Sequence, residues 1–123
     1  MKPNSPVNAK DLLKQAEASE HKEAYQIMSK TGNCRVGIGA RIPPAPTQPS
    51  FFIEIIINLC PDCSKVDLAF LEKALTCLKE LKANGYCLTC QDDNSILCEK
   101  IVPEQSIQSE CNQAATLIKQ FCP

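Results

Sequence analysis

The chain has 123 residues, which allows one domain with its own core and leaves no room for a second core of ordinary size. Its charges nearly cancel, with 13 basic and 14 acidic residues, so neither nucleic acid nor a membrane surface is expected as a partner. The unusual feature is cysteine, of which there are nine. The composition therefore points to cysteine chemistry as the place to look for function.

The expected compartment follows from the apolar runs. No apolar run of signal-peptide length lies near the amino terminus, and the run Ile55–Ile57 is far too short to span a membrane. We therefore expect a cytoplasmic protein. In a reducing compartment, cysteines more often bind metal, act as redox thiols or fill the core than form disulfides, and an odd number cannot all pair within one chain.

The first element expected is a helix over residues 8–30. Asn8 and Asp11 form a start signal close to a capping box. An imperfect apolar stripe follows, made of Leu12, Leu13, Ala16, Ala24, Ile27 and Met28. We accordingly divide the chain into an N-terminal helical segment, residues 1–33, and an α+β cysteine-rich core, residues 34–123, within a single domain.

Two strands come next, over residues 34–42 and 51–59, because apolar residues alternate with other residues in both. Gly37 and Gly39 share the outer face of the first strand, which predicts either close approach of another group there or a bulge. A proline-rich loop joins the strands, so we expect an antiparallel hairpin with Ile42 opposite Phe51. Cys34 would then lie opposite Leu59, beside Cys60.

The second half repeats this order. A capping pattern at residues 64–67 predicts a helix that runs to about Ala83, where Asn84-Gly85 ends it. A hairpin follows, with strands 86–91 and 95–102, and a regular apolar stripe after Pro103 predicts the last helix. The expected fold is therefore α+β: an N-terminal helix, then two ββα units that form a four-stranded, mostly antiparallel sheet with helices packed on one face.

The strongest chemical signal is Cys60-Pro61-Asp62-Cys63, which falls between a strand and a helix. The positive end of a helix dipole lowers the pKa of a nearby thiol, and the resulting thiolate serves both metal binding and redox chemistry. The simpler interpretation is a pair of inert cysteines in a turn. Strand–Cys-Pro-x-Cys–helix order also resembles the active-site segment of thioredoxin-like proteins, which implies an attacking Cys60 and a resolving Cys63.

Other cysteines complete the predicted site. Cys87 and Cys90 are three residues apart, so in a strand their side chains point to opposite faces and cannot chelate one ion. Hairpin register brings Cys34 to Cys60, and the best four-ligand zinc set is Cys34, Cys60, Cys63 and Cys90. Four further thiols are expected to be core or terminal residues: Cys77, Cys98, Cys111 and Cys122. The single histidine, His21, is expected to be exposed to solvent.

Three hypotheses for function remain open. The first is a small, non-enzymatic metal-binding module, with zinc held at the Cys60–Cys63 turn. The second is a thiol–disulfide redox protein that uses the same two residues. The third is an adaptor or oligomerising domain, with an unidentified protein partner or a second copy, whose cysteines are core residues.

Overall fold

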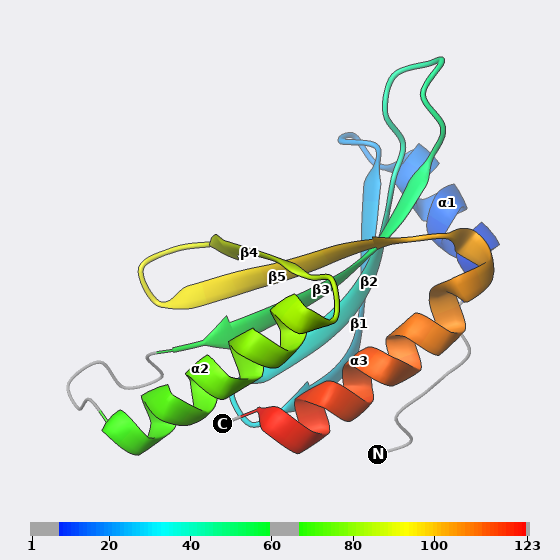
Figure 1. Cartoon of the computed structure of the whole chain (residues 1–123). Helices are drawn as coiled ribbons and strands as arrows, with labels where there is room; N and C mark the ends of the chain where they lie inside the picture. Colours follow the sequence, from blue (N-terminus) through cyan, green and yellow to red (C-terminus); the bar gives the residue numbers. More distant parts are fainter. Residues whose placement is uncertain (1–7, 60–66, 123) are drawn as a thin grey trace.

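The computed structural model describes residues 8–59 and 67–122 (Figure 1). Its elements, in chain order, are α1 (Ala9–Ala18), β1 (Glu23–Thr31), β2 (Cys34–Arg41), β3 (Ser50–Asn58), α2 (Leu68–Ala83), β4 (Cys87–Cys90), β5 (Ser95–Val102), a short 3-10 helix (Glu104–Ser106) and α3 (Ile107–Phe121). The strands form one sheet in the order β1-β2-β3-β5-β4, and all neighbours are antiparallel. The predicted α+β class is confirmed.

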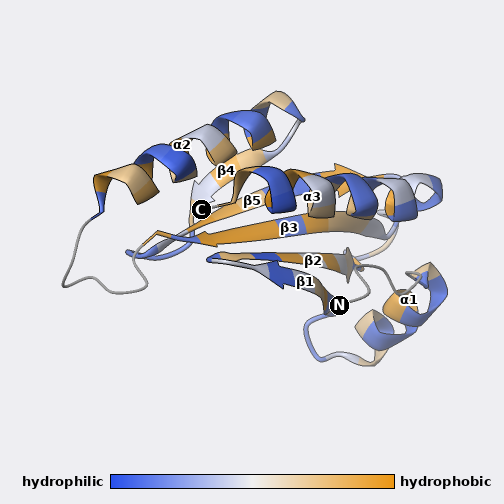
Figure 2. Ribbon diagram, turned by 90° about the horizontal axis from the view of Figure 1, so that it is seen from below, coloured by the Kyte–Doolittle hydropathy of each residue, from blue (hydrophilic) through white to orange (hydrophobic). Residues whose placement is uncertain are grey.

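The helices lie in a layer against this sheet. Helices α2 and α3 cover one face of it, and α1 packs against β1 and β2 (Figure 2). Asn8 caps α1 by accepting hydrogen bonds from the backbone N–H groups of Lys10 and Asp11, as the start signal predicts. Asp67 caps α2 in the same way, through the N–H groups of Ala69 and Phe70.

The prediction of a helix throughout residues 8–30 is wrong in its second half. Helix α1 ends at Ala18, and β1 occupies Glu23–Thr31, so the sheet has five strands rather than four. A β-bulge between Ile27 and Ser29 adds one residue to β1, and Met28 is buried there. Ala24 and Met28, which both contact the core, are four residues apart, and residues at this spacing share a face in a strand as well as in a helix.

The hairpin of β2 and β3 forms as predicted, but its register differs by two residues. Ala40, rather than Ile42, pairs with Phe51, and Cys34 therefore lies opposite Ile57 rather than Leu59. Side chains alternate between the faces with a period of two, so this shift leaves every inward residue inward. The alternating pattern alone cannot distinguish the two registers.

The hairpin of β4 and β5 also forms as predicted, with Leu88 opposite Cys98 and Cys90 opposite Ile96. Its placement differs from expectation, because β5 lies between β3 and β4. Strand β4 is therefore an edge strand, and all four of its residues are exposed. On the side of this hairpin that faces the core, Tyr86, Cys98 and Val102 are buried, whereas Leu88 and Cys90 are exposed.

The core lies between the sheet and the helices. Inward residues of β2, β3 and β5 meet the apolar stripes of α2 and α3, and Leu12 and Ala16 of α1 join the same buried cluster. Free thiols contribute to it, because Cys77 of α2, Cys98 of β5 and Cys111 of α3 are all at most 1% exposed. The prediction that these three residues fill the core is confirmed.

On the face of the sheet opposite α2 and α3, two aromatic rings pack against glycines of β2. The ring of Phe52 lies over Gly39 and that of Tyr25 over Gly37, where a β-carbon would collide with the ring. The guanidinium of Arg41 stacks on Phe52 at 4.5 Å from the ring centroid, and Phe52 is completely buried. The close approach predicted from the two glycines is confirmed.

Candidate functional site

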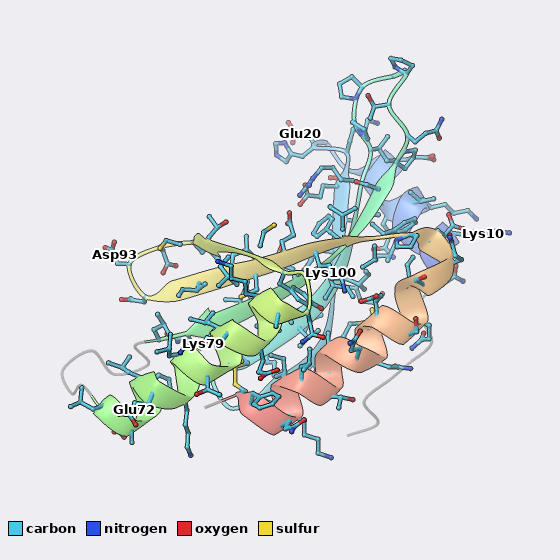
Figure 3. All side chains as sticks on the ribbon, in the orientation of Figure 1. Lys10, Glu20, Glu72, Lys79, Asp93 and Lys100 are labelled. Atoms are coloured by element: carbon cyan, nitrogen blue, oxygen red, sulfur yellow. A yellow bond between two sulfur atoms is a disulfide. The ribbon has the colours of Figure 1, made fainter. Side chains whose placement is uncertain are left out.

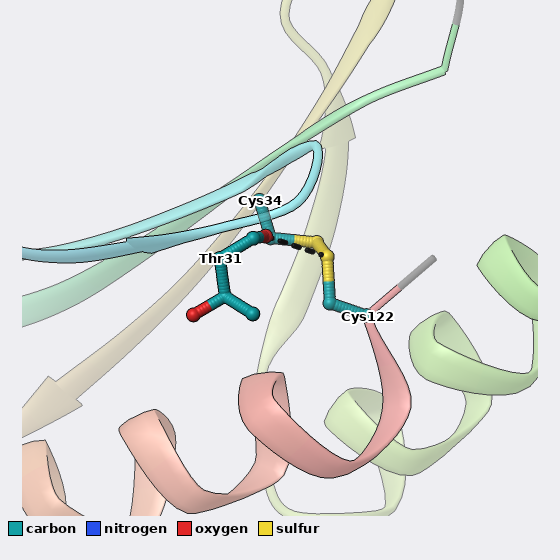
Figure 4. Close-up of a disulfide and its surroundings, with 3 residues drawn as sticks. All are labelled: Thr31, Cys34 and Cys122. Atoms are coloured by element: carbon teal, nitrogen blue, oxygen red, sulfur yellow. Dashed lines mark hydrogen bonds between the residues drawn. A yellow bond between two sulfur atoms is a disulfide. The ribbon is translucent and has the colours of Figure 1, made fainter.

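A disulfide joins Cys34, the first residue of β2, to Cys122, which directly follows α3 (Figure 4). The two Cα atoms are 6.2 Å apart, and Cys34 is buried. The Sγ atom of Cys122 also lies 3.2 Å from the carbonyl oxygen of Thr31, at the end of β1. The disulfide links the carboxyl end of α3 to the sheet. It differs from the expectation that Cys34 is a metal ligand and Cys122 a core or terminal thiol.

The segment that contains Cys60 and Cys63 lies outside the described residues, but both of its anchors lie beside this disulfide. At the first anchor, the backbone N–H of Asn58 donates to the carbonyl of Asn33, the neighbour of Cys34. At the second anchor, Ala69 and Glu72 of α2 line a cavity of about 440 Å³ together with Cys122. The chain therefore leaves the described structure near Cys34 and returns near Cys122.

The structure does not bring Cys90 to this end of the site. Cys34, Ile57, Ile96 and Cys90 occupy one row across the sheet. Three strand spacings, together about 14 Å, therefore separate Cys34 from Cys90. Two ligands of one zinc ion cannot be that far apart, because each Zn–S bond is about 2.3 Å long. His21 is exposed and lies in the turn between α1 and β1, as a solvated residue would.

The helix-dipole argument for Cys63 also changes. The N-cap of α2 is Asp67 rather than Ser64, so Cys63 lies four positions before the cap in the sequence. The dipole acts within about the first turn of a helix. The expectation that Cys63 directly precedes the N-cap is therefore wrong.

The buried thiols are chemically protected. Burial raises the pKa of Cys77 to about 11 and that of Cys111 to about 11. Burial, with a smaller contribution from Cys77, raises the pKa of Cys98 to about 12. A thiol must lose its proton to react or to bind metal, so these three act as small apolar residues. Within residues 8–59 and 67–122, no three potential metal ligands lie together.

Cys87 and Cys90 differ from the buried thiols, because both are exposed on β4. Cys87 pairs with Glu99, and Cys90 with Ile96, in one regular ladder. Their side chains therefore point to opposite faces of the sheet, as predicted, and they do not form a chelating pair. Cys90 is exposed because β4 is an edge strand of the sheet.

We expect a maleimide reagent at neutral pH to label Cys87 and Cys90 of the native protein quickly. Cys77, Cys98 and Cys111 should react only after denaturation, because their thiols are buried and protonated. Mass spectrometry of peptides after timed labelling measures each residue separately. Labelling of native Cys98 as fast as that of Cys87 would contradict this description.

Carboxylates gather on the face of the sheet opposite α2 and α3. Glu54 of β3 lies directly opposite Glu99 of β5. Burial raises the pKa of Glu54, and the charges of Glu99 and Glu23 add to this effect against the opposing influence of Arg35 and Arg41. Burial also raises the pKa of Tyr25 to about 12. Arg41 forms ion pairs with Glu23, at 3.0 Å, and with Glu99, at 3.8 Å, which fits a structural role for these carboxylates.

Comparisons with protein-family models, with curated proteins and with solved structures find no match for the chain. In the parts of the chain that the structure describes, every helix is too short or too polar to cross a membrane. The functional argument therefore depends on the cysteines and their placement.

Proposed function

We propose that the protein is a small, non-enzymatic metal-binding module that holds zinc through thiolates, and that Cys60 and Cys63 supply two of the ligands. Cys34 and Cys122 of the reduced protein supply the other two. The observation that carries this proposal is the 6.2 Å separation of the Cys34 and Cys122 Cα atoms at the point where both anchors of the Cys60–Cys63 segment lie.

Cys122 replaces Cys90 in the ligand set for a geometric reason. Cys90 lies across three strand spacings from Cys34, whereas Cys122 is adjacent to Cys34. Four thiolates are a usual ligand set of a structural zinc site. The charge of the ion also compensates for placing the thiolate of Cys34 in a buried position.

The disulfide and the metal site are alternative states of the same residues in this proposal. A thiol reductant, present in a cytoplasmic compartment, supplies two electrons and two protons that convert the disulfide into two thiols. Zinc binding then releases the thiol protons, because only the thiolate is a ligand. The oxidised protein lacks two ligands and is expected to bind zinc weakly.

Elemental analysis of protein purified under reducing conditions without a chelator tests the proposal. We expect about one equivalent of zinc per chain. The single variants Cys60→Ser, Cys63→Ser, Cys34→Ser and Cys122→Ser should each lower the zinc affinity at least about tenfold, since each removes a ligand. Cys87→Ser and Cys90→Ser are the matched controls and should retain full zinc.

Two outcomes would contradict the proposal. If Cys122→Ser retains full zinc while Cys90→Ser loses it, Cys122 is not a ligand and the proposed set of four cysteines is wrong. If the reduced wild-type protein carries no zinc and binds none on titration, the metal-binding function itself is wrong.

A thiol–disulfide redox function is the second candidate, and the Cys34–Cys122 disulfide favours it. Metal-free protein with a Cys60–Cys63 disulfide that titrates against a glutathione buffer would support this candidate. Metal-free protein whose Cys60 and Cys63 stay reduced would instead support an adaptor or oligomerising domain.

A further inference from the structure

A cavity lies where α2 and α3 meet, and one half of the disulfide borders it. The two helices run side by side in opposite directions, so the end of α3 lies beside the first half of α2 (Figure 1). The cavity has a volume of about 440 Å³, and its lining includes Glu72, Lys73 and Thr76 of α2 together with Gln120, Phe121 and Cys122. This volume is within the range of about 300–1,000 Å³ that is usual for sites that bind small molecules. We call it the α2–α3 cavity.

The two cysteines of the disulfide differ in their access to small molecules. Cys122 is half-buried and lines the α2–α3 cavity, whereas Cys34 is 3% exposed and belongs to the core. A second cavity borders Cys34 and Arg35 from the other face of the sheet. The side chain of Cys34 points to the core face, because successive residues of a strand alternate, so a molecule in that second cavity meets its backbone rather than its sulfur. A small molecule therefore reaches the disulfide from the side of Cys122.

Access, rather than the stability of the leaving thiolate, distinguishes the two sulfur atoms. Burial disfavours a thiolate at Cys34. A thiolate at Cys122 is disfavoured as well, by the negative end of the α3 dipole and by the carbonyl oxygen of Thr31, which lies 3.2 Å from the Cys122 Sγ atom. An attacking thiolate must contact the sulfur with which it reacts, so Cys122 is the residue open to attack.

The polar groups that line the α2–α3 cavity fit a small peptide thiol. The ammonium group of Lys73 suits a ligand carboxylate, and the carboxylate of Glu72 suits a ligand ammonium group. The hydroxyl of Thr76 and the amide of Gln120 can exchange hydrogen bonds with peptide groups. Glutathione has a thiol, two peptide groups, an ammonium group and two carboxylates. A ligand with charges of both signs matches a lining with charges of both signs.

We propose that the α2–α3 cavity binds a small peptide thiol of the glutathione class, which reduces the disulfide by attacking Cys122. The thiolate of the ligand forms a bond to the Cys122 Sγ atom as the bond between the two protein sulfurs breaks, and the released Cys34 thiolate takes a proton from water. A second ligand thiolate then attacks the ligand sulfur of this mixed disulfide and releases Cys122, which also takes a proton. Two ligand thiols are thereby oxidised to one disulfide, and two cysteines are reduced. No step involves zinc, so the proposal stands apart from the metal-binding function.

Trapping of the mixed disulfide tests which sulfur is attacked. The oxidised full chain is treated with glutathione in the presence of a chelator and quenched with acid, and its peptides are analysed by mass spectrometry. We expect glutathione on Cys122, and glutathione on Cys34 would overturn the proposal. A second measurement does not require the mixed disulfide of the wild-type protein to accumulate. Glutathione disulfide should modify Cys122 of reduced Cys34→Ser at least about tenfold faster than Cys34 of reduced Cys122→Ser. Equal rates would also overturn the proposal.

Lys73→Glu tests whether the thiol binds in the α2–α3 cavity. It should slow reduction by glutathione at least about threefold and leave reduction by 2-mercaptoethanol, which carries no charged group to pair with Lys73, nearly unchanged. Lys79→Glu is the matched control, because Lys79 is another exposed lysine of α2 and lies outside the cavity (Figure 3). It should react as the wild-type protein does. Equal slowing in both variants would overturn binding in the cavity. The chelator keeps zinc out of each measurement, so the outcome is separate from that of the metal proposal.

Discussion

Replacement of Cys122 by serine is expected to lower the free energy of unfolding of the oxidised protein by about 4 kcal/mol. The disulfide joins residues 88 positions apart, so it removes a large amount of conformational entropy from the unfolded chain. Urea denaturation of the wild-type and variant proteins, without reductant, measures the difference. Cys34→Ser should show a similar loss, because it breaks the same bond.

Cys87→Ser is the control for this experiment, since Cys87 is an exposed free thiol and its replacement should change stability little. Addition of a reductant and a chelator should remove most of the difference between the wild-type protein and Cys122→Ser. A wild-type protein that is no more stable than Cys122→Ser under oxidising conditions would show that the disulfide does not form in solution.

Replacement of Phe52 by alanine is expected to lower the free energy of unfolding by about 4 kcal/mol. Phe52 is completely buried between Gly39 and the guanidinium of Arg41, even though it lies on the face that α2 and α3 leave uncovered. Its removal leaves a cavity over Gly39, because glycine has no side chain to fill the space. Thermal or urea unfolding measures the loss.

Ile101→Ala is the matched control for Phe52→Ala. Ile101 pairs with Phe52 across the strands and shares its face, but its side chain is 58% exposed. We expect Ile101→Ala to cost less than about 1 kcal/mol. Equal losses in the two variants would show that Phe52 is not packed as described.

The sequence predicts those helices and strands in which apolar residues recur at a regular spacing. Strands β2 and β3 and the stripe of α3 keep a constant spacing, and the structure confirms each of them. Strand β1 escapes prediction because the spacing of Ala24 and Met28 fits a helix as well as a strand, and the polar Gln26 between them breaks the apolar alternation; the bulge after Ile27 interrupts it again. Local pattern cannot reveal such a bulge, because it is set by pairing with β2.

The candidate site was predictable only in part, since its geometry depends on distant parts of the chain. The burial of Cys77, Cys98 and Cys111 follows from their positions on apolar faces. The partner of Cys34 does not, because it requires knowing that α3 ends beside the start of β2. The distance between Cys34 and Cys90 likewise depends on β5 lying between β3 and β4.

The Cys34–Cys122 disulfide also makes most of the oxidised molecule a covalent ring. A protease that cuts one peptide bond between these two residues, for example in the proline-rich loop that joins β2 to β3, opens the ring without releasing a fragment. The product keeps both new chain ends on one molecule and gains only the mass of one water. Two fragments separate only after reduction. Before reduction, the nicked and the intact oxidised protein therefore have nearly the same molecular mass and the same particle size.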